Sequence, residues 1–269
     1  MCVLQIAPRL SHILKNNPKL KEAMKEGRVA LCTVDTWLLN KLKKFNSLSK
    51  LECISEVTSA SATGLYDAFD LDYITLNLKV FGIERDALSM VVNNSHDFGF
   101  THASVVGAPI RIAAIIADQA ASLIGNACFN KMDAKITLGT GTFLNVNTGD
   151  KCRGSRNGAH PMIAWSIRLR GKESEKTDST VYYTERQFND SSTLIRFAKT
   201  VGLCSNVKEL SDMAFSVTDS NGVTFIPKFY STAGFIGYKQ STTKCHLVRA
   251  VLESVVFIVV QFYFLNHED

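Results

Sequence analysis

The sequence lacks the features that mark secreted, membrane-spanning or nucleic-acid-binding proteins. Its 269 residues carry 30 Lys and Arg against 25 Asp and Glu, and these charges are spread out rather than gathered in a basic stripe. We therefore expect no nucleic-acid partner. The N-terminus has no charged-then-apolar signal pattern. The apolar run at 255–265 is interrupted by Gln261 and is too short for a bilayer, which needs about 20 apolar residues. We expect no membrane span and a cytoplasmic location.

Cysteine and histidine patterns exclude further classes. The seven cysteines are odd in number and widely spaced, and no C-x-x-C pair occurs. Such a pattern is typical of free thiols in a reducing compartment, rather than of a disulfide framework or a zinc site. The six histidines are scattered along the chain. The sequence therefore predicts no metal-ligating residues. It also shows no internal repeat and no low-complexity tract.

What is present is an alternation of helical and strand patterns, which favours an α/β architecture. An apolar fraction of 46% is enough for a sizeable core. Asp35 and Thr36 are predicted to offer a helix N-cap. Helices are predicted over 11–27, 120–128, 192–201 and 241–257, and strands over 29–34, 110–117, 134–138 and 142–146.

The dipeptide Asp118-Gln119 follows the predicted apolar strand 110–117. Ligand clefts of α/β sheets open beyond the C-terminal ends of strands. There the carboxylate could accept a proton from an attacking hydroxyl, a contribution of about 10²–10⁴-fold in rate. The amide of Gln119 could hold a substrate hydroxyl through its donor and acceptor groups. Taken alone, the dipeptide is explained more simply by Asp118 capping the following helix.

The tetrapeptide 139–142, Gly-Thr-Gly-Thr, forms the predicted turn of a β-hairpin. Glycines beside a Thr hydroxyl let backbone amides and the hydroxyl approach phosphate oxygens closely. Phosphoryl transfer depends mostly on positioning and charge stabilisation, so such a turn suits it. The turn is not a Walker A loop, because the Gly-Lys-Ser/Thr ending is absent. In isolation an ordinary hairpin turn is the simpler explanation.

The order of these motifs, together with several other stretches, resembles the FGGY carbohydrate kinases and specifically the glycerol kinases. Residues 95–99 and 139–143 are most similar to the divergent glycerol kinase 5 group. The resemblance is colinear over nearly the whole chain. The stretches that carry it are 33–39, 59–67, 117–120, 138–143, 147–149, 221–223, 226–227, 246–250 and 252–254.

The resemblance implies an incomplete actin/hexokinase-type (ribonuclease H-like) two-domain kinase fold. Residues 1–130 would be the C-terminal part of the family's N-terminal domain, and residues 131–269 the N-terminal part of its C-terminal domain. Asp118 is similar to the catalytic base that also contacts the substrate. Gln119 is similar to a polyol-binding amide. Gly139 and Thr140 are similar to residues that hold the nucleotide phosphates.

The same resemblance implies the reactants. ATP with Mg²⁺ would be the phosphoryl donor, and glycerol or a related polyol the acceptor, with glycerol 3-phosphate as the product. A homo-oligomer, or a hetero-oligomer with a full-length kinase, is the partner arrangement that the resemblance allows.

The sequence departs from the family pattern at several positions. The family begins with a strand, a glycine-threonine phosphate hairpin and an Arg-Glu pair, all of which precede the segments matched here. Ala117 and Ala120 replace the usual glycine and second glutamine, and Ser192 stands about where a glycine is expected. The chain also stops before the family's glycine-rich adenine turn. From this resemblance we expect about half of a kinase, truncated at both ends.

Three interpretations follow and stay open at this point. The first is an ATP-dependent glycerol or polyol kinase with Asp118 as its base. The second is a catalytically inactive isoform that binds or regulates a full-length kinase, because a base without the opposite phosphate cradle cannot hold an in-line geometry. The third is a chain that does not fold stably, because apolar faces would stay exposed where family strands are missing.

Overall fold

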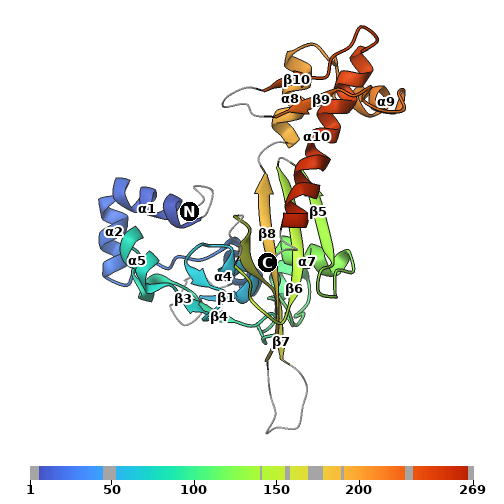
Figure 1. Cartoon of the computed structure of the whole chain (residues 1–269). Helices are drawn as coiled ribbons and strands as arrows, with labels where there is room; N and C mark the ends of the chain where they lie inside the picture. Colours follow the sequence, from blue (N-terminus) through green and yellow to red (C-terminus); the bar gives the residue numbers. More distant parts are fainter. Residues whose placement is uncertain are drawn as a thin grey trace. The chain divides into compact units, whose positions relative to one another are not determined.

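The computed structural model describes residues 6–44, 53–139, 141–154, 158–168, 178–188, 191–227 and 233–265 (Figure 1). The described helices are α1 (Ile6–Asn16), α2 (Pro18–Lys25), α3 (Val34–Lys43), α4 (Val57–Ser61), α5 (Thr75–Phe81), the 3₁₀ helix η2 (Arg85–Ala87), α6 (Ala103–Val106), α7 (Asp118–Gly125), α8 (Ser191–Thr200), α9 (Glu209–Phe215) and α10 (Lys244–Leu265). The described strands are β1 (Ile54–Glu56), β2 (Tyr66–Asp67), β3 (Asp72–Tyr73), β4 (Met90–Val92), β5 (Ala134–Leu138), β6 (Thr142–Gly149), β7 (His160–Arg168), β8 (Asp178–Phe188), β9 (Thr224–Ile226) and β10 (Gly234–Ile236). Helices and strands are interspersed, which confirms the predicted α/β class.

The chain divides into two compact units. The first unit comprises Met1–Asp133, Val146–Gly154 and Pro161–Thr184, and the second comprises Ala134–Asn145, Ser155–His160 and Glu185–Asp269. The division therefore passes through strands such as β6. The family-domain boundary between residues 130 and 131 stays a prediction.

The first unit begins with two helices where the sequence predicted one over 11–27. Helix α1 ends at Asn16, and Pro18 is the first residue of α2. Proline is tolerated at the start of a helix, where its missing N–H costs no hydrogen bond, but it cannot continue the preceding helix. Leu14 and Met24 are buried, and they pack with α5 in one core cluster.

The strand predicted over 29–34 is wrong. Among the described residues, Leu31 forms an isolated parallel bridge with Leu88, and no longer ladder surrounds it. The neighbouring parallel pair is β1 with β4, in which Ile54 lies opposite Met90. Residues 29–31 are therefore half-buried, but they do not form a strand of a sheet.

The N-cap predicted at Asp35 and Thr36 is also wrong. Helix α3 begins at Val34, and Thr33 is its N-cap with an extended backbone. Asp35 and Thr36 therefore lie inside the first turn. Thr36 is fully buried, and its hydroxyl donates to the carbonyl oxygen of Ile54 over 2.9 Å. This threonine joins α3 to β1 instead of starting the helix.

The segment 110–117, predicted as an apolar strand, is not a strand of a sheet. It makes an isolated antiparallel bridge from Arg111 to Phe100. Ile110 is 56% exposed, and the rest of the segment is exposed or half-buried. A continuous apolar run is typical of a strand covered on both faces. Here no described neighbour covers both faces, so the prediction is wrong.

Strands β5, β6, β8 and β7 form a four-stranded sheet in that order. The predicted strand 134–138 is confirmed as β5. The returning strand begins at Thr142, as predicted, and continues to Gly149, three residues beyond its predicted end. The hairpin on which the phosphate-turn prediction rests is therefore present.

Alternate residues of β7 and β8 serve two different cores, as the two-residue period of a strand requires. Ile163 and Tyr182 pack against α4 and β2 in one cluster. Ala164 and Tyr183 pack with Leu123 of α7 in another. All of these residues belong to the first unit. The N-terminal helix pair, α4 and α7 are thus held by separate small cores.

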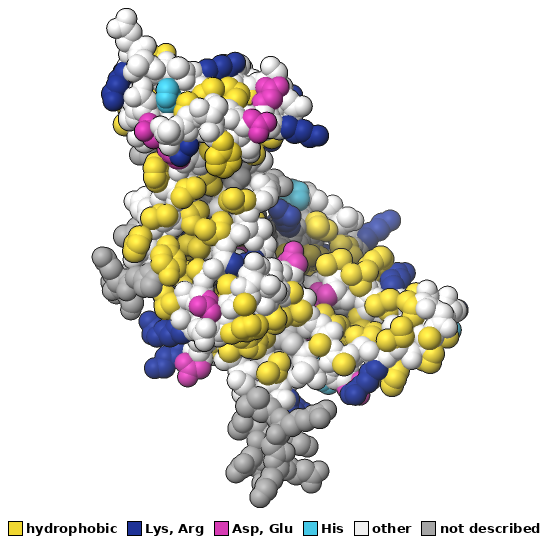
Figure 2. Space-filling view, turned by 90° about the vertical axis from the view of Figure 1, so that its right-hand side faces the viewer, with side chains coloured by type: hydrophobic (Ala, Val, Ile, Leu, Met, Phe, Trp, Pro, Cys, Tyr) yellow, Lys and Arg dark blue, Asp and Glu magenta, His cyan; other side chains and the backbone are white. Residues whose placement is uncertain are grey.

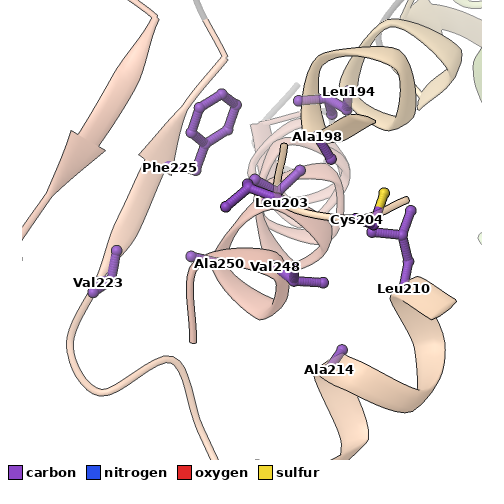
Figure 3. Close-up of a cluster of buried hydrophobic side chains, with 11 residues drawn as sticks. Leu194, Ala198, Leu203, Cys204, Leu210, Ala214, Val223, Phe225, Val248 and Ala250 are labelled. Carbon is purple, nitrogen blue, oxygen red and sulfur yellow. The ribbon is translucent and has the colours of Figure 1, made fainter. Parts of the chain in front are cut away.

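The second unit has its core among α8, α9, α10 and the hairpin β9–β10 (Figure 3). The rings of Phe197 and Phe235 lie 5.0 and 4.8 Å from that of Phe225 between centroids. The helix predicted over 192–201 is confirmed as α8. The helix predicted over 241–257 begins later, at Lys244, and continues to Leu265. The most deeply buried side chains of this core are Leu194, Ala198, Val248 and Val251.

Apolar side chains reach the surface of both units (Figure 2). Val34, Leu76 and Phe215 are 72, 69 and 85% exposed. In the part of the chain that the structure describes, no helix has the length and apolar character needed to cross a bilayer.

Candidate active site

Asp118 is the first residue of helix α7, and its side chain is exposed. Its Oδ1 accepts a hydrogen bond of 2.7 Å from the backbone N–H of Gln119. Unpaired N–H groups and the helix dipole favour a negative charge at this end of a helix. Among the described residues Oδ2 has no hydrogen-bond partner. This oxygen can therefore accept a proton or a hydrogen bond from an incoming hydroxyl.

The backbone before Asp118 is held by residues far away in the sequence. Ala117 is the N-cap of α7, and its N–H donates to Thr58 Oγ1 over 2.8 Å. The N–H of Ile115 donates to the carbonyl oxygen of Asn94 over 3.1 Å, and its own carbonyl oxygen accepts from Asn94 Nδ2 over 2.8 Å. Sequence reasoning missed both Thr58 and Asn94. The available signal for Thr58 was its place immediately before the family-like stretch 59–67.

Gln119, the predicted polyol-binding amide, is half-buried in the first turn of α7. Its backbone N–H is used by Asp118, and its carbonyl oxygen accepts from Ser122 Oγ over 3.0 Å. The helix therefore fixes the backbone of Gln119 beside the candidate base. The role of its side-chain amide stays a prediction.

The predicted phosphate turn joins β5 to β6 in the second unit. Gly139 is exposed, and its N–H donates to the carbonyl oxygen of Gly141 over 2.9 Å. A Cβ added at Gly139 would meet no heavy atom nearer than 4.0 Å, so the space around it is open. Thr140 lies outside the described residues. The amide of Gly139 is used within the turn itself, so a phosphate that takes this amide must displace a local hydrogen bond.

The described residues hold no cluster of three or more His, Cys, Asp or Glu side chains with metal-binding geometry. The six described cysteines are free thiols. A hydrogen bond from the Cys32 thiol lowers the pKa of Cys53. Ser89 Oγ also lies 3.1 Å from the Cys53 sulfur. The same hydrogen bond and burial raise the pKa of Cys32. This thiol pair lies apart from α7 in the sequence and takes no part in the candidate site.

The first unit also contains a cavity of about 210 Å³, which Cys32 helps to line. Apolar residues such as Leu10 and Leu65 line it, together with Thr33, Ser55 and Ser89. Of the described site residues, Asp118 and Gly139 are exposed, Gln119 is half-buried, and Gly141 on the other side of the turn is buried. None of these residues lines the cavity.

Solved structures share this arrangement of elements. The crystal structure of Plasmodium falciparum glycerol kinase with ADP superimposes with a TM-score of 0.78 at 28% sequence identity, covering 93% of this chain and 49% of that one. A xylulose kinase from Rhodospirillum rubrum superimposes with a TM-score of 0.76 at 15% identity, covering 99% and 53%. The chain thus has the mixed α/β, actin-like ATPase fold of these kinases, over about half of their length.

Sequence comparisons lead to the family. The N-terminal domain of the FGGY family of carbohydrate kinases matches residues 3–125. Glycerol kinase 5 of Bos taurus is 37% identical over 268 residues, covering 96% of this chain and 48% of the relative. The chain is therefore similar to the FGGY family of carbohydrate kinases, both in sequence and in fold. It spans about half the length of the curated relatives that it matches.

Proposed function

We propose that this chain takes part in the ATP-dependent phosphorylation of glycerol or a related polyol, with Asp118 as the general base. The observation that carries the proposal is the 37% identity to glycerol kinase 5 over 96% of the chain. The exposed carboxylate at the start of α7, with Oδ2 without a described partner, supports the role of Asp118. Gln119 would hold a second hydroxyl of the polyol beside it.

In the proposed reaction the acceptor hydroxyl gives its proton to Asp118 Oδ2. The hydroxyl oxygen forms a bond to the γ-phosphorus of ATP, and the bond from that phosphorus to the bridging oxygen of ADP breaks. The products are a polyol phosphate and ADP. The base would contribute about 10²–10⁴-fold to the rate. The larger share of such a reaction comes from positioning and charge stabilisation of the phosphoryl group.

The donor side of the reaction would use the turn at Gly139 and Thr140 to contact the nucleotide phosphates. The space around Gly139 supports this role, because a phosphate oxygen can approach a glycine that carries no side chain. Mg²⁺ would enter with ATP, since it is usually held by substrate phosphates, waters and one or two carboxylates. The relative solved with ADP supports a nucleotide as the donor.

A second candidate function is that of a non-catalytic partner of a full-length glycerol kinase. The observation that favours it is the exposure of apolar side chains on both units, such as Leu76 and Phe215. The chain would then bind a polyol or a kinase subunit without completing phosphoryl transfer. An exposed apolar surface on both units is compatible with such a partnership (Figure 2).

Transfer of labelled phosphate distinguishes the two candidates. The purified chain is incubated with glycerol and ATP that is labelled in the γ-phosphate, after a cooperative thermal melt has shown that it is folded. We expect labelled glycerol 3-phosphate and one ADP for each product molecule. Folded chain that forms no labelled product, and that co-purifies with a full-length glycerol kinase, would contradict the first proposal and support the second.

A further inference from the structure

A buried carboxylate lies behind the segment that carries Asp118. Glu56 is fully buried at the end of β1, where it is the N-cap of α4. Its oxygens accept from the N–H of Thr58 (2.6 Å), from Thr58 Oγ1 (2.7 and 2.8 Å), from the N–H of Ser59 (2.7 Å) and from Asn94 Nδ2 (2.6 Å). A carboxylate has about four lone-pair sites. Uncharged donor groups therefore use the full accepting capacity of Glu56.

Thr58 links this carboxylate to the start of α7. Its hydroxyl has one proton, and the contacts to Glu56 use it. The oxygen lone pair is then directed at Ala117, whose N–H donates to it over 2.8 Å. A hydroxyl that donates to a carboxylate becomes a stronger acceptor, since linked hydrogen bonds polarise one another. Glu56 thus fixes the orientation of the hydroxyl that holds the residue immediately before Asp118.

Asn94 links the same carboxylate to the segment two residues earlier. One N–H of its amide donates to Glu56, and the other donates to the carbonyl oxygen of Ile115. The amide oxygen accepts from the N–H of Ser166 in β7 over 2.7 Å. Asn94 is 4% exposed, and these contacts use its whole side-chain amide. The Asn94 side chain therefore has no freedom to move without breaking a contact to Glu56, Ile115 or β7.

We propose that Glu56 is the positioning residue of the Asp118 base, acting through Thr58 and Asn94 on the backbone of 115–117. This inference rests on the proposed function, because positioning affects a rate only if Asp118 is the base. The segment 110–117 is not a strand of a sheet. Ile110 and Ile112 make backbone hydrogen bonds with residues 98–101, whereas Ile115 and Ala117 are held by Asn94 and Thr58. A displacement of about 1 Å at a reacting group can cost about 10²-fold in rate.

Hydroxyl-deleting and hydroxyl-preserving variants test the inference. Thr58→Val removes the hydroxyl and keeps the shape, Thr58→Ser keeps the hydroxyl, and Glu56→Gln places an N–H donor against donors. Thr63→Val is the matched control. Like the Thr58 hydroxyl, the Thr63 hydroxyl donates one proton and accepts a backbone N–H, but it donates to the carbonyl oxygen of Ala60 rather than to a carboxylate, and it accepts from Leu65. Each variant is measured by thermal melt, by amide hydrogen exchange at Ala117, and by kcat and KM for ATP and glycerol.

We expect Thr58→Val and Glu56→Gln to raise the exchange rate at Ala117 at least tenfold and to lower kcat by about tenfold to a hundredfold, in line with the cost of a misplaced group. KM for ATP should stay within twofold. Thr58→Ser should leave both the exchange rate at Ala117 and kcat close to the wild-type values. Thr63→Val should change neither quantity, even if it lowers the melting temperature as much as Thr58→Val does.

The failures of the two proposals are distinguishable. An active wild-type chain whose Thr58→Val variant keeps kcat would overturn the positioning role, and so would an unchanged exchange rate at Ala117. A folded wild-type chain without any turnover would instead overturn the proposed function. In that case the exchange rates still decide whether Glu56 holds the 115–117 backbone.

Discussion

The two segments that carry the candidate site residues are held in different ways. The segment before Asp118 is fixed by Asn94 and Thr58, which lie more than 20 residues away in the sequence. The turn that begins at Gly139 is closed by a local hydrogen bond to Gly141. The first is therefore part of the tertiary structure of its unit, and the second is a feature of one hairpin.

This difference suggests that the segment carrying the base and the turn that contacts phosphate have different mechanical requirements in the proposed reaction. A base must be held at one distance from the hydroxyl that it deprotonates, and buried contacts give it that rigidity. A turn that contacts phosphate must admit and release a nucleotide, so the Gly139 amide must be able to exchange its hydrogen bond to Gly141 for one to phosphate. The predictions below test this comparison, from the largest expected effect to the smallest.

The largest effect is expected in the core of the second unit. Leu194 is 1% exposed, and Leu194→Ala should lower the free energy of unfolding by about 2–5 kcal/mol. Hydrogen exchange should rise through α8 and α10, while the Ala117 amide in the first unit keeps its protection. Val201→Ala is the control, since Val201 follows α8 and is 50% exposed. Equal loss of protection at Ala117 would show that the base segment depends on the second unit.

The second-largest effect on the free energy of unfolding is expected for substitution of Gly237. Gly237 has a φ of +78°, and a Cβ there would collide with the carbonyl oxygen of Gly222. The left-handed conformation alone costs an alanine about 1–2 kcal/mol. Chemical denaturation of Gly237→Ala should therefore show a loss of at least that size. A variant as stable as the wild type would mean that the backbone around Gly237 relaxes freely.

A smaller effect is expected for substrate binding at Gln119. Gln119→Ala removes an amide that can donate and accept, and one hydrogen bond is worth about 0.5–1.5 kcal/mol. We expect KM for glycerol to rise up to about tenfold, while KM for ATP is unchanged. Steady-state kinetics with each substrate varied in turn make the measurement. A rise in KM for ATP alone would place Gln119 on the nucleotide side.

The smallest effect on stability is expected at Gly139. A Cβ at this position would lie 4.0 Å from the carbonyl oxygen of Gly141, which is ordinary contact. Gly139→Ala should change the free energy of unfolding by no more than about 0.5 kcal/mol. The same variant should weaken nucleotide binding if phosphate approaches this glycine. Calorimetric titration with ATP checks the second statement, and unchanged affinity would remove Gly139 from the donor side.

Sequence reasoning found the α/β class, the similarity to the family and the β5–β6 hairpin, because motif order and strand patterns are local signals. It failed where tertiary context decides the structure. The apolar segment 110–117 was predicted as a strand, but among the described residues it forms only an isolated bridge, because no local pattern shows which neighbour a strand will pair with. Thr36 looked like a cap and is a buried link to β1. Glu56 was missed because the burial of a glutamate cannot be read from its neighbours in the sequence.

The role of Asp118 is tested most directly by measuring turnover and glycerol binding together in Asp118→Asn. Asparagine keeps an oxygen that accepts the Gln119 N–H but cannot take a proton from the substrate. We expect kcat to fall about 10²–10⁴-fold while glycerol affinity stays within severalfold and the melting temperature is unchanged. Asp212→Asn, an exposed aspartate in the first turn of α9, should leave all three unaltered. Turnover of Asp118→Asn within twofold of the wild type would contradict the account.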